Sequence, residues 1–477
     1  MNPLGKSRGW SWSLCLLVCM AACRGGPSTP PPSASETPAR RQAATLALVG
    51  VGVLTMEGGR VLADQTVLVD GERIVAVGPA ASTPVPEGAA RVDGRGRWLM
   101  PGLVDMHLHL QQGTGEAGDA AGQQLKLLLA NGVTTARALG AAPTGLELRA
   151  RVRKGEVLGP RLLVSGPSFH GKSVKGPEHA RQRVREQKAA GFDLLKTHGG
   201  LGRETYDALV DEAKAQGLRL SGHVTPDVGL AHALASGQQV EHLDGWLAAL
   251  LPPGDTAQVD QIDFGDALER MDPARIPALA QATRQAGVWT SPTLDLFELL
   301  AGTPGLEALK ARPELRYVPA PAVEAWTKVL SDPELAGAPA ARRQRFVELR
   351  RQVVRGLHAA GAGLLVGSDS PQLFMVTGFA VHREMEALAN AGMPAEAVLE
   401  AATRGAAESL GETAEWGTVA PGKRADLLLL EEDPRQDVRH TRAISGVVLG
   451  GRWLPGARLD AMLEEVAQAV RPPAPAP

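Results

Sequence analysis

The sequence predicts an α/β fold: a (β/α)8 TIM barrel with a small β-sandwich domain formed from both ends of the chain. Three observations lead to this prediction. Between about residues 98 and 415, apolar strand-like runs alternate with helix-like stretches. Glycine commonly stands where those helix-like stretches stop, as a left-handed cap requires. Before and after this region, short β-like runs are separated by turn signals rather than by helices.

The alternation supplies eight strand-like runs, the number in a closed parallel barrel. In chain order they are LMPGLVDMHLHL, GVTTARALG, PRLLVSGPSF, GFDLLKTHG, LRLSGHV, QQVEHLD, GVWTSPTL and GLLVGSDS. Because periodicity does not prove closure, an open doubly wound sheet stays an alternative at this point. The segment from about residue 295 to 358 is longer than a usual connection, and we expect a lid or interface insertion there.

The same pattern predicts how the chain is divided. Residues 45–97 and 416–457 are expected to form the small β domain, because both contain short β-like runs such as TLALVGVGVL and ISGVVLGG. Residues 98–415 are expected to form the catalytic barrel. Residues 458–477 are expected to be a C-terminal helix and tail.

The N-terminus predicts export. Residues 1–23 are typical of a lipoprotein signal peptide: a basic start, a short apolar run and the sequence MAAC, with Cys23 as the lipidated residue. Cleavage at an ordinary small-residue site is the alternative. Residues 24–44 are rich in Pro, Ser and Thr and predict an extended tether. We therefore expect a protein anchored by lipid to a bacterial membrane, on its periplasmic or outer-membrane face.

Composition limits both partners and chemistry. The net charge of -2 and an aromatic content of 4% give no support for nucleic-acid binding. All three cysteines lie within the first 23 residues, so the body of the chain offers no thiolate to a metal. Any metal must be held by histidine, carboxylate or modified lysine.

Polar residues of the kinds that bind metals follow the predicted strands. In a barrel, catalytic groups gather at the C-terminal ends of the strands. The residues found at those ends are His107, His109, Lys196, His223, His242 and Asp369. Strands one and eight are neighbours in a closed barrel, as are strands five and six, so the sequence predicts two adjacent metal positions. Lys196 has the reach to lie between them and, carboxylated by carbon dioxide, to bridge both.

Each residue also has an ordinary structural explanation. Lys196 could be an ion-paired barrel lysine, and His223 and His242 could be satisfied core histidines. Asp369, within GSDSP, could cap the following helix. Several such coincidences of position would have to occur together, so the metal hypothesis is favoured.

At this point the chain resembles the amidohydrolase superfamily, in its branch of metal-dependent hydrolases with a carboxylated lysine. The resemblance covers about residues 46–456 and rests on VDGRGRWLMPGLVDMHLHL, LLVGSDS and GTVAPGKRADLLLL. It implies that His107 and His109 are ligands from strand one, that Lys196 is a bridging carbamate, and that His223 and His242 bind a second ion. It also implies that Asp369 is both a ligand and the catalytic acid and base. The arrangement is most similar to dipeptidases that cleave Xaa-Pro or Xaa-basic bonds.

The predicted reaction is hydrolysis of an amide C–N bond, most simply in a dipeptide or N-acyl amino acid. Two divalent ions, with zinc as the default, would share a bridging hydroxide while Asp369 transfers the proton. His170 is expected to donate to the developing oxyanion. Candidate substrate contacts are His198, Arg203 and Tyr206, with Arg137 as a further candidate for a substrate carboxylate.

Other functions remain open. Imidazolonepropionases and many deaminases place Glu three residues after the histidine of strand five, where this chain has Pro226. That difference counts against an imidazolonepropionase-like or deaminase-like function but does not exclude it. Lactone or phosphotriester hydrolysis and a binding protein that has lost catalysis are further alternatives. The expected partners are small molecules or dipeptides, and a homo-oligomer is also an expectation.

Overall fold

 

The computed structural model describes residues 44–111, 120–257, 259 and 261–471. The predicted signal peptide, the lipidation site Cys23 and nearly all of the predicted tether lie outside them. Within the described part of the chain, no helix combines the length and the apolar character needed to cross a membrane.

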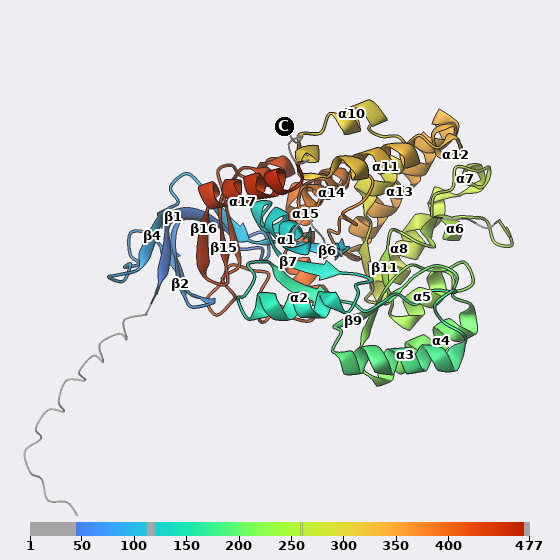
Figure 1. The fold of residues 1–477 in the computed structure, drawn as a ribbon, viewed down its shortest axis with the longest axis horizontal. Helices are drawn as coiled ribbons and strands as arrows, with labels where there is room; N and C mark the ends of the chain where they lie inside the picture. The colour runs from blue at the N-terminus through green and yellow to red at the C-terminus, as the bar shows by residue number, and fades with distance from the viewer. Residues whose placement is uncertain (1–43, 112–119, 258, 260, 472–477) are drawn as a thin grey trace, which may run out of the picture. The chain divides into compact units, whose positions relative to one another are not determined.

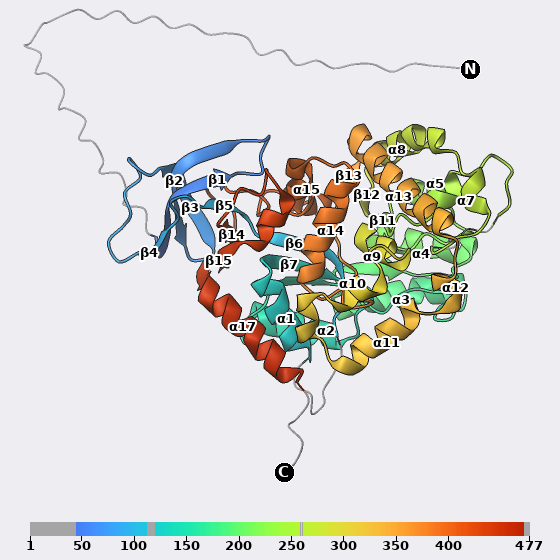
Figure 2. The same cartoon turned by 90° about the horizontal axis from the view of Figure 1, so that it is seen from above.

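The small β domain draws its strands from both ends of the chain, as predicted. In Figure 2 the blue strands from the N-terminal part lie beside the red strands from the C-terminal part. The sheet order is β16-β15-β14-β5-β1-β2-β3, and β4 pairs with β1. Its strands are β1 (Leu46–Leu54), β2 (Val61–Asp70), β3 (Arg73–Pro79), β4 (Ala90–Asp93), β5 (Trp98–Pro101), β14 (Leu427–Leu430), β15 (Ile444–Leu449) and β16 (Arg452–Pro455).

Alternating apolar residues of these strands form one core. Leu46 and Leu48 of β1, Val67 and Val69 of β2, and Leu427 of β14 belong to the same buried cluster. Residues two apart on a strand point to the same side, so this spacing buries one face of each strand. Hydrogen bonds connect the strands into a continuous sheet, since β1 pairs with β4 through its first half and with β5 near its end.

The eight predicted barrel strands form a closed parallel ring. They are β6 (Leu103–Leu108), β7 (Val133–Ala138), β8 (Arg161–Val164), β9 (Leu194–Thr197), β10 (Arg219–Gly222), β11 (Gln239–Glu241), β12 (Trp289–Ser291) and β13 (Gly363–Leu364). Ladders join β6 to β8 and β9 to β13. Parallel bridges from Ser165 to Leu194 and from Leu108 to Ser370 close the two gaps. The chain is therefore a TIM barrel with an added β domain, and the open-sheet alternative is excluded.

Helices surround the barrel, with α2 to α4 on one side and α13 and α14 on the other in Figure 1. The first nine are α1 (Ala120–Ala130), α2 (Thr144–Arg153), α3 (Pro177–Ala190), α4 (Arg203–Ala215), α5 (Leu230–Ser236), α6 (Trp246–Ala249), α7 (Ala267–Arg270), α8 (Ile276–Gln285) and α9 (Leu294–Leu300). The others are α10 (Leu306–Lys310), α11 (Ala320–Leu330), α12 (Pro333–Ala336), α13 (Ala340–Ala360), α14 (Phe379–Asn390), α15 (Ala395–Ala401), α16 (Arg404–Ser409) and α17 (Gly456–Ala469).

The predicted first barrel strand, LMPGLVDMHLHL, is in fact two strands. β5 pairs with β1 and β14 of the small domain, whereas β6 pairs with β7 of the barrel. Gly102 stands between them, and a Cβ there would meet the Thr134 side chain at 2.3 Å. A single apolar run thus serves both domains, because glycine permits the close approach at which the chain passes from one sheet to the other.

The long insertion supplies helices to the mouth of the barrel. α9 to α12 occupy residues 294–336, and the rest of the insertion is α13, which packs against α8. Val329 of α11 and Leu335 of α12 line the cavity described below. The insertion therefore borders the cavity, and its role as a lid or an interface stays a prediction.

Candidate active site

The predicted metal ligands meet at one mouth of the barrel. His107 lies in β6 and Lys196 in β9, while His223 and His242 follow β10 and β11 directly. Asp369 follows the last strand after a short extended segment. Because parallel strands end at the same face of a barrel, residues 89 to 262 positions apart along the chain come together here.

Three of the residues form a compact group of ligand atoms. His109 Nε2 lies 2.8 Å from Asp369 Oδ1, and His107 Nε2 lies 3.3 Å from the same oxygen. One ligand atom from each of the three residues lies within 4.8 Å of the others. Imidazole and carboxylate are ligands that suit divalent zinc.

His223, His242 and Lys196 complete the group. The rings of His223 and His242 stack with centroids 4.6 Å apart, and the centroid of His242 is also 4.6 Å from that of His107. The Nζ of Lys196 lies 3.3 Å from His107 Nε2, and its side chain is buried. All six predicted residues therefore belong to one site.

In each of the four histidines, Nδ1 lies within hydrogen-bond distance of a group outside the set of candidate ligands. The pairs are His107 Nδ1 with Glu241 Oε2 at 2.8 Å, His109 Nδ1 with the Leu139 carbonyl at 2.9 Å, His223 Nδ1 with Asp244 Oδ2 at 2.8 Å, and His242 Nδ1 with Thr293 Oγ1 at 2.8 Å. Metal-binding histidines characteristically use one nitrogen for such a contact and the other for the ion. The donor set therefore fits a metal centre.

Burial sets the protonation of these groups. It lowers the pKa of His107 to about 4, with a further contribution from Lys196, and it lowers that of His242 well below the ordinary value. Both rings are therefore neutral near pH 7, the form that binds metals. Burial also lowers the pKa of Lys196, against the opposing effect of Glu241 and Asp369.

Glu241, which the sequence analysis did not select, supports the site from inside the barrel. It accepts hydrogen bonds from Arg137 Nη2 at 2.6 Å and from Ser221 Oγ at 2.5 Å, besides its contact with His107. Burial opposes its ionisation, yet Arg137 and His107 hold the pKa of Glu241 well below its usual range. A charged residue within the apolar strand run QQVEHLD was the available signal, because a buried carboxylate needs partners.

The prediction that Arg137 contacts a substrate carboxylate is wrong. It is fully buried and donates to the Met106 carbonyl, to Gln239 and to Glu241. The side chain lies inside the barrel, since it reaches Gln239 and Glu241 of β11, a strand that does not pair with β7. Its role is to hold Glu241 beneath His107.

Two of the candidate ligands have left-handed backbone conformations. The φ angle is 63° at His242 and 55° at Asp369. Residues other than glycine adopt this conformation at a cost of roughly 1–3 kcal/mol, and such strain clusters at functional sites. The Asp369 amide donates to the His107 carbonyl at 2.6 Å, and Arg350 donates to the His242 carbonyl, so local hydrogen bonds fix both residues.

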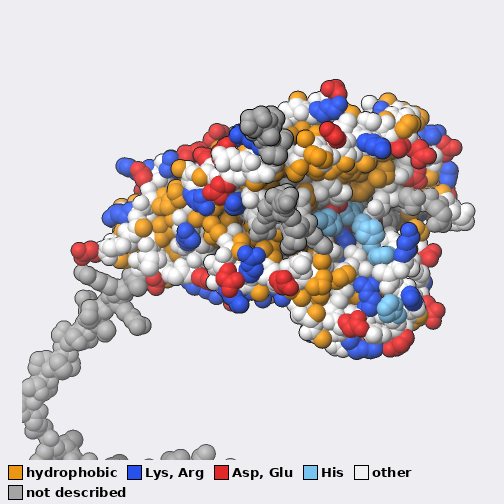
Figure 3. Space-filling view, viewed as in Figure 1, with side chains coloured by type: hydrophobic (Ala, Val, Ile, Leu, Met, Phe, Trp, Pro, Cys, Tyr) orange, Lys and Arg blue, Asp and Glu red, His pale blue; other side chains and the backbone are white. Residues whose placement is uncertain are grey.

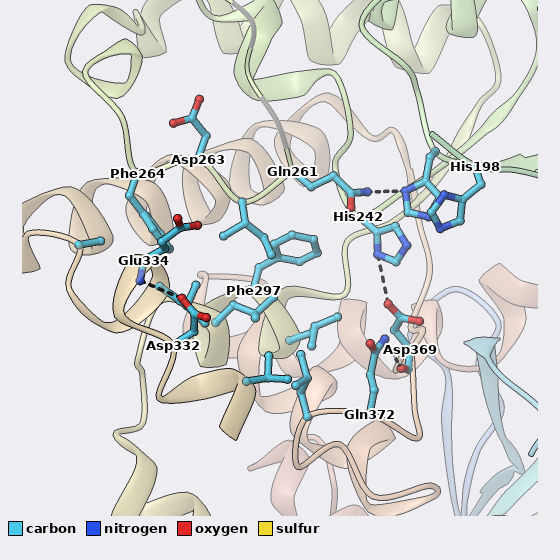
Figure 4. Close-up of a pocket in the computed structure, with 18 of the residues that line it drawn as sticks. His198, His242, Gln261, Asp263, Phe264, Phe297, Asp332, Glu334, Asp369 and Gln372 are labelled. Atoms are coloured by element: carbon cyan, nitrogen blue, oxygen red, sulfur yellow. Dashed lines mark hydrogen bonds and ion pairs between the residues drawn. The ribbon is translucent and has the colours of Figure 1, made fainter. Parts of the chain in front are cut away.

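A cavity of about 990 Å³ opens over these residues. Lys196, His223, His242 and Asp369 lie on one side of it, while apolar and acidic side chains from residues 262–264 and from the insertion form the rest. Figure 4 shows His242 and Asp369 pointing toward one another at its edge, and Figure 3 shows histidine side chains gathered in the corresponding hollow beneath an apolar surface.

Two other predicted site residues, His198 and His170, lie in or beside the cavity. His198 lines the cavity, with its ring centroid 4.3 Å from that of His223. His170 lines a neighbouring hollow, with its ring 6.4 Å from that of His198. Its predicted role at the oxyanion stays a prediction.

Arg203 and Tyr206 do not line the cavity, and the structure gives them other contacts. Arg203 pairs with Asp207 at 3.2 Å, and its Nη2 lies 2.7 Å from His232 Nδ1. Tyr206 is buried in the core. Both residues belong to α4, and neither is among the residues that line the cavity, so their predicted contact with the substrate is not supported.

Comparison with known proteins agrees with this geometry. Residues 98–454 match the Amidohydrolase family. An imidazolonepropionase from Acidiphilium cryptum (strain JF-5) is 27% identical over 401 residues, which cover 82% of this chain and 90% of that protein.

Solved structures show the same relationship. A bottromycin amidohydrolase superposes with a TM-score of 0.68 at 25% identity, covering 90% of this chain and 91% of the other. A candidate prolidase from Bifidobacterium longum superposes with a TM-score of 0.66 at 26% identity, covering 88% of this chain and 98% of the other. Metal dependence and hydrolysis at carbon–nitrogen bonds are features of this family, and the His107, His109 and Asp369 cluster is present here. The chain belongs to the amidohydrolase family.

Proposed function

We propose that this protein is a two-metal hydrolase that cleaves an amide bond in a dipeptide or N-acyl amino acid. The observation that carries the proposal is the buried Lys196, whose Nζ lies 3.3 Å from His107 Nε2 among four histidines and Asp369. A site for a single ion would leave this lysine without a role. Zinc is the proposed metal because imidazole and carboxylate donors suit it.

Lys196 is proposed to carry a carbamate. In its neutral form, Nζ forms a bond to the carbon of CO2 and releases one proton to solvent. Burial favours that neutral form because it lowers the pKa of the lysine. The product is anionic and presents two oxygen atoms, so it would offer one donor toward each group of histidines.

Asp369 is the proposed acid and base. Burial opposes its ionisation, but His107 and His109 hold the pKa of its carboxyl below the ordinary value. Bound divalent ions would supply an activated water and polarise the scissile carbonyl. Asp369 then takes a proton from the attacking water and returns it to the leaving nitrogen.

The similarity to imidazolonepropionases favours a second candidate, opening of a cyclic amide. Those enzymes are related over most of the chain. However, Pro226 has no ionisable group to contribute three residues after His223, and Lys196 is suited to a second ion. Lactone and phosphotriester hydrolysis are further alternatives, and assays with both classes of compound would test them.

Export with a lipid anchor at Cys23 also remains our proposal. It is supported by the sequence MAAC at the end of a short apolar run.

The proposed function predicts metal-dependent amide hydrolysis. The zinc-loaded protein in bicarbonate would be assayed against Xaa-Pro and Xaa-basic dipeptides, N-acyl amino acids, cyclic amides, lactones and phosphotriesters. We expect hydrolysis of linear amides, its loss with a chelator, and its return with zinc. Turnover confined to cyclic amides would support the second candidate, and turnover that survives complete metal removal would contradict the proposal.

A further inference from the structure

The wall of the cavity that faces the candidate ligands is apolar. α9 contributes Leu296, Phe297 and Leu300, and the segment after α6 contributes Ile262 and Phe264. Val329 extends this wall onto α11. Apolar surface of this extent provides a favourable environment for an apolar group of the substrate.

The exposed apolar side chains lie at the mouth of the same cavity. Among the residues that the structure describes, the large hydrophobic side chains that are exposed are Ile262, at 40%, and Val329, at 48%. Both line the cavity, although they belong to segments more than 60 residues apart. Such exposure, confined to a single opening, indicates a surface that an apolar ligand covers.

Away from His198 and the candidate ligands, the charged side chains that line the cavity are acidic. They are Asp263, Asp332 and Glu334, and among the described lining residues Lys196 is the one lysine or arginine. Asp332 and Glu334 are exposed. Lys196 itself lies deep among the candidate ligands, so the described residues that line this cavity include no other lysine or arginine to pair with a substrate carboxylate.

α9 holds the apolar wall in place. Its Asp295 amide donates to Glu384 of α14 at 2.9 Å, and its Glu298 makes two contacts with Arg351 of α13, at 2.7 and 2.8 Å. Asp295 and Glu298 are both buried, so these contacts fix α9 against α13 and α14. The wall is therefore a built feature of the barrel rather than a loose edge.

We infer that the cavity selects amides that carry a bulky apolar group and have a neutral or cationic remainder, rather than a free carboxylate. This inference rests on the proposed function and narrows it to dipeptides and N-acyl amino acids whose carboxyl group is blocked as an amide. A free carboxylate at the opening would meet like charge from the acidic side chains and no basic partner.

The test compares matched compounds that differ in one charge. N-acyl phenylalanine and Xaa-Phe dipeptides would each be assayed with a free carboxylate and as the C-terminal amide. We expect kcat/KM to be about tenfold higher for the amide than for the free acid. This preference should become smaller at high ionic strength, because salt screens exposed charges. Equal or faster turnover of the free acids would overturn the inference while leaving the proposed function intact. If no amide of either form is hydrolysed, the proposed function itself fails.

Substitutions at the opening provide the second arm. The triple variant Asp263→Asn, Asp332→Asn and Glu334→Gln is expected to remove most of the preference, and asparagine preserves the cap that Asp332 provides to the Glu334 amide. A control triple, Glu147→Gln, Glu186→Gln and Asp460→Asn, changes the net charge equally outside the cavity. A preference that is unchanged in the first triple, or lost equally in both, would contradict the role of the acidic side chains.

Binding to the metal-free protein gives a readout that does not depend on catalysis. Phenylbutylamine, phenylbutyramide and phenylbutyrate would be titrated by calorimetry. We expect the amine and the amide to bind more tightly than the carboxylate, and Val329→Ser to weaken all three. Tightest binding of the carboxylate would overturn the inference.

Discussion

Replacing Asp369 by asparagine is expected to reduce kcat by about 10³-fold or more, a loss typical of removing a general acid and base. Asp369 lies 2.8 Å from His109 Nε2 and is buried, so asparagine fills nearly the same space. What it removes is the carboxylate that takes up and returns the proton. The measurement is kcat and KM on the best amide found in the screen, together with the metal content of the variant.

The matched control is Asp460→Asn, which makes the same chemical change at an exposed position of α17. Its kcat is expected to equal that of the unmodified protein. If Asp369→Asn keeps its metal and also keeps kcat within tenfold, Asp369 is not the proton-transfer group.

Replacing Arg137 by methionine is expected to lower the free energy of unfolding by about 3–5 kcal/mol, as when one partner of a buried ion pair is removed. The guanidinium is fully buried and lies 2.6 Å from Glu241 Oε1, so its loss leaves a buried carboxylate without its main counter-charge. Chemical denaturation of the metal-free protein measures the effect without a contribution from metal binding.

A double variant separates stability from metal binding. Adding Glu241→Leu to Arg137→Met removes the unpaired charge and is expected to recover part of the stability. Affinity for zinc should remain roughly 10–100-fold weaker, because His107 loses the contact that orients its ring. The control Arg153→Met lies at an exposed position of α2. If Arg137→Met is as stable as that control, the buried pair does not hold the site.

The sequence was sufficient for the parts of the fold that follow local periodicity. Apolar runs alternating with helix-like stretches predict a barrel, and the strand ends then identify His107, Lys196 and Asp369 without coordinates. Closure could not be obtained in this way, because it depends on bridges such as that from Leu108 to Ser370. The division of the first run at Gly102 was also hidden, since both halves are equally apolar.

The inner layer of the site was not predictable from the spacing of residues. Arg137 and Glu241 lie on different strands and meet only when the barrel closes around them. Arg203 and Tyr206 illustrate the opposite error, because the sequence does not determine which side chains of α4 face the cavity. The apolar wall needed the structure as well, since α9 and α11 are brought to one opening by the insertion.

The most direct test of the central claim is a crystal structure of the zinc-loaded protein grown in bicarbonate, with anomalous scattering measured at the zinc edge. We predict two zinc ions within coordinating distance of His107, His109, His223, His242 and Asp369, with continuous density extending from Lys196 Nζ as a bridging carbamate. A single zinc ion beside an unmodified Lys196 would contradict the account.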